Sequence, residues 1–185
     1  MSKVNLYVTL SDGRKLGYNE YGPADGKPLF YFHGTPSSRI EWQIFGGEQL
    51  ASRLHLRIIS IDRPGMGLSD FQGGRRLLDW PTDIASLADA LDLDQFSVLA
   101  FSGGSPYAAA CALAIPERLT SVGIVSGAGP FTEKGVADGI NPVSRQFFDL
   151  CRDKPVRGRM MLRMMGAMAH YAPNRLIAQT MAALP

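Results

Sequence analysis

One serine stands where the chain changes from strand to helix periodicity, and this feature constrains the fold more than any other. The residues before it, 96–101, have the apolar, β-rich character of a strand, and the Ala-rich residues 108–114 have that of a helix. A sharp strand-to-helix turn forces its central residue to a positive φ and needs small residues two positions before and after it. Around Ser102 these positions hold Ala100 and Gly104. The sequence therefore predicts a strained turn with Ser102 at its centre.

Ser105 is the competing candidate in the same run. Tyr107 stands two positions after Ser105, where a bulky ring would collide with the turn. We therefore predict that Ser102 is the raised nucleophile, and that the N–H of Gly103, at the start of the helix, points at a developing oxyanion. The alternative is that the Ser-Gly-Gly-Ser run forms only a tight turn.

The composition limits the classes of protein to be considered. With 185 residues, 45% of them apolar, the chain can bury one sizeable domain with an appendage, and a net charge of +2 is too small to indicate a nucleic-acid partner. The first residues are polar, without the apolar core of a signal peptide, and no apolar run reaches membrane-spanning length. We expect a cytoplasmic protein in which Cys111 and Cys151 are buried thiols, not a disulfide or a metal site.

Elements along the chain alternate between strands and helices. An opening β-hairpin is predicted from residues 4–10 and 15–21, and the apolar runs 29–32 and 56–61 are typical of strands covered on both faces. Helical spacing returns from Trp42 to Leu54 and from Asp79 to Leu91, and a further strand is predicted from Leu119 to Val125. This order predicts an α/β fold, a mostly parallel sheet with helices on both faces and a site at the carboxyl ends of its strands.

After residue 130 the pattern changes. Residues 142–185 contain helical stretches only, at 143–151, 156–171 and 175–184, and they are rich in Met and Arg. We interpret residues 1–130 as the core and residues 131–185 as a helical cap or lid over the substrate. The alternative is a basic amphipathic segment that binds a membrane surface or a partner groove. Binding to anionic vesicles that salt weakens would favour the alternative.

Taken together, three loops and the helical segment resemble the α/β-hydrolase fold superfamily, in particular its esterase and prolyl-aminopeptidase-like serine hydrolases. The loops are His33-Gly34 after the first central strand, Asp-Arg-Pro-Gly-x-Gly-x-Ser at 62–69 after the next, and the serine turn. The resemblance covers roughly residues 4–130. It implies that the N–H groups of Thr35 and Gly103 bind the oxyanion, and that His33 and Gly34 shape the loop, His33 not being the catalytic base.

The serine at the turn implies chemistry on the acyl carbon of an ester, thioester, amide or lactone in a small-molecule substrate. In this family an Asp or Glu and then a His follow the serine. Only His170 follows Ser102, within a helical pattern of the predicted lid, and Ser126 stands where a carboxylate is expected. We therefore expect the N-terminal part of a hydrolase, impaired on its own, self-associating or completed by a companion chain. The alternative is a non-catalytic binding protein on the same scaffold.

Two other patterns compete with this interpretation. Gly65-x-Gly67 after a strand resembles part of a dinucleotide loop, but Asp70 occupies the position of the third glycine. Asp62 and Asp70 are a candidate metal pair, although no His or Cys joins them, and we interpret them as loop-capping carboxylates that pair with Arg63. The sequence therefore predicts neither a cofactor nor a metal.

Overall fold

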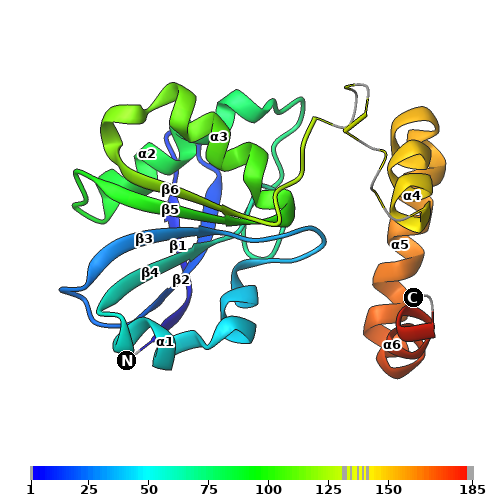
Figure 1. Cartoon of the computed structure of the whole chain (residues 1–185), viewed down its shortest axis with the longest axis horizontal. Helices are drawn as coiled ribbons and strands as arrows, with labels where there is room; N and C mark the ends of the chain where they lie inside the picture. Colours follow the sequence, from blue (N-terminus) through cyan, green and yellow to red (C-terminus); the bar gives the residue numbers. More distant parts are fainter. Residues whose placement is uncertain are drawn as a thin grey trace. The chain divides into compact units, whose positions relative to one another are not determined.

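The computed structural model describes residues 2–130, 133, 135, 136, 138, 140 and 142–182. The chain divides into two compact units, Met1–Gly129 and Pro130–Pro185. The first unit contains a six-stranded sheet with helices on both faces, and the described helices of the second unit are α4, α5 and α6 (Figure 1). The predicted α/β class is confirmed.

The sheet has the strand order β1-β2-β4-β3-β5-β6. Its strands are β1 (Lys3–Thr9), β2 (Lys15–Tyr21), β3 (Lys27–Phe32), β4 (Leu56–Ile61), β5 (Phe96–Phe101) and β6 (Leu119–Val125). β1 and β2 are antiparallel, β2 is antiparallel to β4, and β4, β3, β5 and β6 are parallel neighbours. Because β3, β4 and β5 are parallel, the loops that follow them leave the sheet on the same side, at the carboxyl ends of the strands.

The predicted β-hairpin is present. Its turn closes with a hydrogen bond from Leu10 N to Arg14 O at 2.8 Å, and Asp12 Oδ1 accepts from Arg14 N at 3.1 Å. Gly13 has a φ of 86°, which a residue without a Cβ adopts without strain. Arg14 then reaches across to Asp83 on α2, at 2.7 Å, and ties the hairpin to that helix.

Two apolar clusters cover the two faces of the central strands. Phe30 and Phe32 point into the larger cluster, beneath α2 (Trp80–Ala90) and α3 (Ser105–Ala114), whereas Tyr31 points into the smaller one, beneath α1 (Gly47–Arg53). Figure 1 shows α1 on one side of the sheet and α2 and α3 on the other. The continuous apolar run of β3 is therefore explained by burial on both faces.

The prediction of one continuous helix from Trp42 to Leu54 is wrong, because the structure has two separate helices there. The segment forms a 3₁₀ helix, η1 (Arg39–Phe45), and then the separate helix α1. Gly46 between them has a φ of 116°, and Gly47, the first residue of α1, has a φ of 49°; these left-handed residues end one helix before the other begins. Glu41 and Trp42 of η1 are buried.

β6 is the last strand of the sheet and is poorly covered. In the described part of the chain, it pairs with β5 on one side only. Val122, Ile124 and Val125 are 38%, 50% and 49% exposed, which is high for apolar residues of a parallel strand. This edge of the first unit therefore presents apolar side chains together with unpaired backbone groups.

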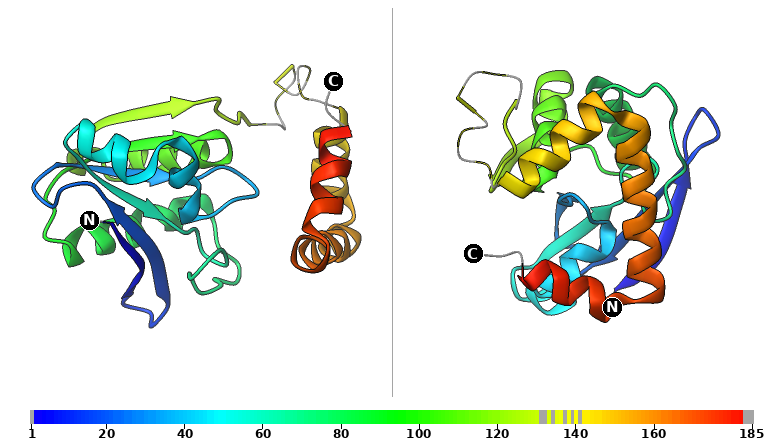
Figure 2. Two further views of the ribbon diagram at one scale, coloured as in Figure 1. Left: turned by 90° about the horizontal axis from the view of Figure 1, so that it is seen from below. Right: turned by 90° about the vertical axis from the view of Figure 1, so that its right-hand side faces the viewer.

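The second unit is described by three helices, α4 (Pro142–Asp153), α5 (Pro155–Tyr171) and α6 (Pro173–Ala182), which follow one another in Figure 2. Gly158 lies against α4, where a Cβ on it would come 3.0 Å from the sulfur of Cys151. The small residue therefore lets α5 approach α4 closely. Cys111 is buried in the first unit, as predicted, whereas Cys151 is only half-buried. Burial raises the pKa of the Cys111 thiol to about 12.

Candidate active site

Ser102 occupies the strand-to-helix turn with the predicted backbone strain. β5 ends at Phe101, Ser102 has a φ of 47°, and a short 3₁₀ turn, η3 (Ser102–Gly104), leads into α3. Ala100 is buried, and a Cβ on Gly104 would lie 2.9 Å from the carbonyl carbon of Phe32. Both flanking positions therefore need small residues. The hydroxyl of Ser102 accepts and donates no hydrogen bond among the residues that the structure describes.

The hydroxyl of Ser105 has a different place. It donates to the carbonyl oxygen of Ser102 at 2.7 Å and accepts from the backbone N–H of Ala128 at 2.7 Å. Ser105 is itself buried. The Ser105 hydroxyl therefore links the turn to the segment after β6, and it acts as both a hydrogen-bond donor and an acceptor.

The loop after β3 lies directly beside the turn. A methyl group placed on Gly34 would lie 3.5 Å from Ser102 Cβ, and one placed on Gly103 would lie 2.9 Å from Thr35 Cβ and 3.2 Å from Thr35 N. The backbone N–H of Thr35 makes no hydrogen bond within the described part of the chain. The structure thus brings together Ser102, Gly103, Gly34 and Thr35, all named from the sequence.

His33 is fully buried and both of its ring nitrogens are engaged. Nδ1 lies 2.8 Å from the carbonyl oxygen of Gly34, and the N–H of Arg63 donates to Nε2 at 3.4 Å. Because the carbonyl can only accept, the proton of the neutral ring is on Nδ1. Burial, aided by the nearby charge of Arg63, lowers the pKa of His33 to about 4. The ring is therefore neutral at ordinary pH and braces the loop.

Arg63 also binds the loop that follows β3. Its guanidinium donates to the carbonyl oxygens of His33 and Gly34, the latter at 2.7 Å, and to Thr35 Oγ1 at 2.8 Å. The side chain is almost completely buried and lies 5.0 Å from the ring centre of Tyr107 on α3. With these oxygens held by Arg63, the peptide units of the loop have a fixed orientation.

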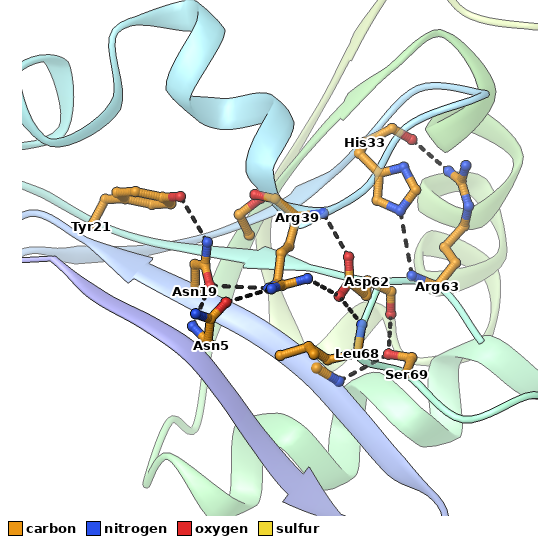
Figure 3. Close-up of polar contacts among 11 residues, drawn as sticks. Asn5, Asn19, Tyr21, His33, Arg39, Asp62, Arg63, Leu68 and Ser69 are labelled. Atoms are coloured by element: carbon orange, nitrogen blue, oxygen red, sulfur yellow. Dashed lines mark hydrogen bonds and ion pairs between the residues drawn. The ribbon is translucent and has the colours of Figure 1, made fainter. Parts of the chain in front are cut away.

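Asp62 does not pair with Arg63, which corrects the interpretation from the sequence. Its carboxylate accepts from Nη1 of Arg39 at 2.8 Å and from the N–H of Leu68 at 2.8 Å (Figure 3). Arg39 also donates to Asn19 at 3.1 Å, and Asp62 is fully buried. Asp62 therefore ties η1, β2 and the 62–69 loop together. Among the described residues, no group of acidic, His or Cys side chains is arranged to hold a metal ion.

Of the other two histidines, His55 lies in the first unit and His170 in the second. His55 precedes β4, at the amino ends of the parallel strands, whereas Ser102 lies at their carboxyl ends. His55 is exposed, and its Nε2 lies 3.7 Å from Oδ2 of Asp25. His170 lies on α5 in the second unit, is exposed, and packs edge-on against the ring of Tyr171 at 4.6 Å. The described part of the first unit therefore supplies no histidine that is free to take a proton from Ser102.

A shallow hollow of about 330 Å³ lies near this region, lined by Phe45, Gly46, Gln49, Leu50 and Arg53. The ring of Phe45 packs edge-on against that of Phe101, at 5.3 Å between centres, and Phe101 precedes Ser102. None of the predicted site residues lines the hollow. Phe45 therefore both lines the hollow and packs against Phe101.

Sequence reasoning missed Glu41 as a neighbour of the site. Its carboxylate accepts a hydrogen bond from Gly34 N at 2.8 Å and another from Tyr31 Oη at 2.6 Å. The only sequence signal was a charged residue beside Trp42 in an otherwise apolar stretch. That signal marks an unusual position but does not reveal the partner.

Known proteins are similar to this chain over its first unit and beyond. Residues 27–148 match the sequence profile of the alpha/beta hydrolase fold. A non-heme chloroperoxidase from Streptomyces lividans is 35% identical over 130 residues, which are 69% of this chain and 46% of that protein. An uncharacterised hydrolase from Saccharomyces cerevisiae is 28% identical over 151 residues, 80% of this chain and 50% of that protein.

A solved hydrolase from Pseudomonas aeruginosa shares the fold, with a TM-score of 0.66 and 20% identity over 94% of this chain and 64% of that one. The chain spans about half the length of the two curated relatives above. In the described part of this chain, no helix has both the length and the apolar character needed to cross a membrane.

Proposed function

The chain belongs to the α/β-hydrolase fold family, and from this premise we propose that it carries the nucleophile and the oxyanion donors of a serine hydrolase. In this proposal Ser102 attacks the acyl carbon of an ester, thioester, amide or lactone. The N–H groups of Thr35 and Gly103 stabilise the negative charge that develops on the carbonyl oxygen. His33 and Gly34 shape the loop that carries Thr35.

The single observation that carries the proposal is the contact between two loops at the turn. Ser102 is held at a φ of 47°, and the backbone of Thr35 lies against Gly103. A non-glycine residue held in the left-handed region is strained, and such strain clusters at functional sites. Other described residues without glycine's freedom, such as Asp92 and Ser126, also have a positive φ, so the neighbouring backbone of Thr35 supports the proposal more than the strain does.

We further propose that the activity of this chain alone is impaired. Attack by a serine requires a base to take its proton, and the described residues of the first unit place no histidine or carboxylate at hydrogen-bond distance from the Ser102 hydroxyl. Oxyanion donors and binding alone give a residual acceleration of about 10³- to 10⁴-fold over water. We expect turnover of an activated ester at that level, rising when a companion polypeptide supplies an acid and a base.

Labelling with a fluorophosphonate tests the proposal. The reagent forms a covalent bond with a reactive serine, and without a base beside Ser102 the reaction should be slow. After prolonged incubation with excess reagent, intact-mass measurement should show one adduct on the folded chain and none on Ser102→Ala. Ser11→Ala, in the exposed hairpin turn, is the matched control and should label like the parent chain. A parent chain that stays unlabelled, or a Ser102→Ala chain that still labels or hydrolyses ester, would overturn the proposal.

A second candidate function is binding without catalysis on the same scaffold. The observation that favours it is that the described residues of the first unit place no histidine or carboxylate at hydrogen-bond distance from the Ser102 hydroxyl. The labelling experiment separates the two functions, because a binding protein has no need of an activated serine.

For the helical second unit we propose the role of a substrate lid. Apolar side chains on α5 are exposed, including Met160 and Met164 at 60% each, and Met suits contact with substrates of varied shape. Flotation with anionic vesicles provides the contrary test. Binding that high salt abolishes would assign α5 to a membrane surface instead.

A further inference from the structure

The carboxylate of Glu41 is the least expected group near the proposed nucleophile. Glu41 lies on η1, is 8% exposed, and forms no ion pair with a described residue. Burying a charge without an ion partner costs free energy unless hydrogen bonds compensate. The compensation here comes from Gly34 N at 2.8 Å and Tyr31 Oη at 2.6 Å. Burial, together with the hydrogen bond from Tyr31 to Glu41, raises the pKa of the Tyr31 phenol.

These two bonds fix the loop from one side. Tyr31 belongs to β3, a central strand, so Glu41 connects the loop to the rigid part of the sheet. Gly34 is packed between Glu41 and the turn, because a methyl group on it would lie 3.2 Å from Glu41 Oε1 and 3.5 Å from Ser102 Cβ. A displacement of Glu41 would therefore move Gly34 relative to Ser102.

The opposite side of the same peptides is held by Arg63, which binds the carbonyl oxygens of His33 and Gly34. Once Glu41 accepts from the N–H of Gly34, the next N–H along the loop, that of Thr35, is the one without an acceptor in the described structure. The bond to Glu41 thus determines which amide of the loop stays available beside Gly103.

We propose that Glu41 is the positioning residue of this loop: by holding the N–H of Gly34 it aims the N–H of Thr35 at the carbonyl oxygen of an acyl group on Ser102. This inference rests on the proposed function. The hydrogen bond between Glu41 and the N–H of Gly34 can be measured without any reaction, from the NMR spectrum of the Gly34 amide.

The test compares Glu41→Ala with Glu41→Gln. Alanine removes the acceptor, and because small misplacements of catalytic groups cost up to about 100-fold, we expect labelling by fluorophosphonate to slow by that order. Glutamine keeps a carbonyl acceptor for Gly34 and should restore the rate to within about 5-fold of the parent chain. The backbone amide proton of Gly34 should shift upfield in the NMR spectrum of Glu41→Ala and much less in that of Glu41→Gln.

Glu48→Ala is the matched control, because Glu48 also accepts from a glycine N–H, that of Gly22 at 2.9 Å, far from the turn. It should leave the labelling rate unchanged. If the parent chain labels and Glu41→Ala labels equally fast, the inference is wrong and the proposed function stands. If no chain labels, the proposed function fails, and the Gly34 resonance decides the anchoring: an unchanged shift in Glu41→Ala and Glu41→Gln overturns it.

Discussion

At the scale of single residues, backbone conformation and protonation decide what the site can do. Ser102 has a positive φ because the strand must turn sharply into a helix, and the small residues around it were visible in the sequence. His33 was visible too, but its state depends on burial. Both ring nitrogens are taken by backbone groups, so this histidine supports the loop from inside the protein.

Protonation of His33 leads to a prediction about stability and pH. The pKa of His33 is lowered from 6.5 to about 4 in the folded chain, so between these values the unfolded chain binds a proton that the folded chain does not. Stability should therefore be complete above pH 6.5 and fall as the pH drops toward 4, by up to about 3 kcal/mol from this group. Urea denaturation of the parent chain and His33→Asn from pH 7.5 to 4 measures it. Equal pH dependence in the two chains would refute this role of His33.

At the scale of elements, periodicity and turn residues predicted every strand of the sheet and the helices α2 and α3. The hairpin, the buried runs of β3 and β4, and the turn at Ser102 each carry a local signal that burial or backbone sterics impose. The helix expected from Trp42 to Leu54 failed because Gly46 and Gly47 interrupt it. Apolar spacing alone does not show such a break.

Side-chain partners between elements were the part that the sequence could not supply. The expected pairing of Asp62 with the adjacent Arg63 was wrong, and Arg39, 23 positions away, takes that place. Several arginines are available to each carboxylate, and only the three-dimensional arrangement of η1 against β4 selects one. Glu41 was missed for the same reason. Only the packing of η1 against the loop after β3 brings its carboxylate to the N–H of Gly34.

The buried Arg39–Asp62 pair gives the prediction at this scale. Arg39→Met leaves a fully buried carboxylate without its counter-charge, which should cost about 3 to 5 kcal/mol of unfolding free energy. Arg39→Met combined with Asp62→Asn removes the orphaned charge and should recover much of the loss. Chemical denaturation of the two single variants and the double variant measures the coupling. Additive losses would show that the pair does not act as a unit.

At the scale of the whole molecule, the first unit is unevenly covered. α1, α2 and α3 bury the central strands, whereas β6 at the edge leaves Val122, Ile124 and Val125 largely exposed. An edge strand with unpaired backbone groups and apolar side chains is a template for pairing with another chain. The family relationship and the mostly parallel sheet were predictable from the order of the motifs. The extent of this exposed edge is visible only in the structure.

We therefore expect the chain to self-associate through β6 as its concentration rises. Ile124→Lys places a charge on the edge strand and should shift the distribution toward the monomer, and Ile44→Lys, at a residue that is 81% exposed on η1, is the control. Sedimentation velocity over a range of concentrations reports the species. A chain that stays monomeric at every concentration, or that associates equally in both variants, would contradict this role of β6.

The most direct measurement of the central claim is a crystal structure of the chain after reaction with a fluorophosphonate. We predict phosphorus bound to Oγ of Ser102 and one phosphoryl oxygen about 2.7 to 3.1 Å from both Thr35 N and Gly103 N. An adduct on a different residue, no adduct at all, or a phosphoryl oxygen turned away from these two amides would contradict the account.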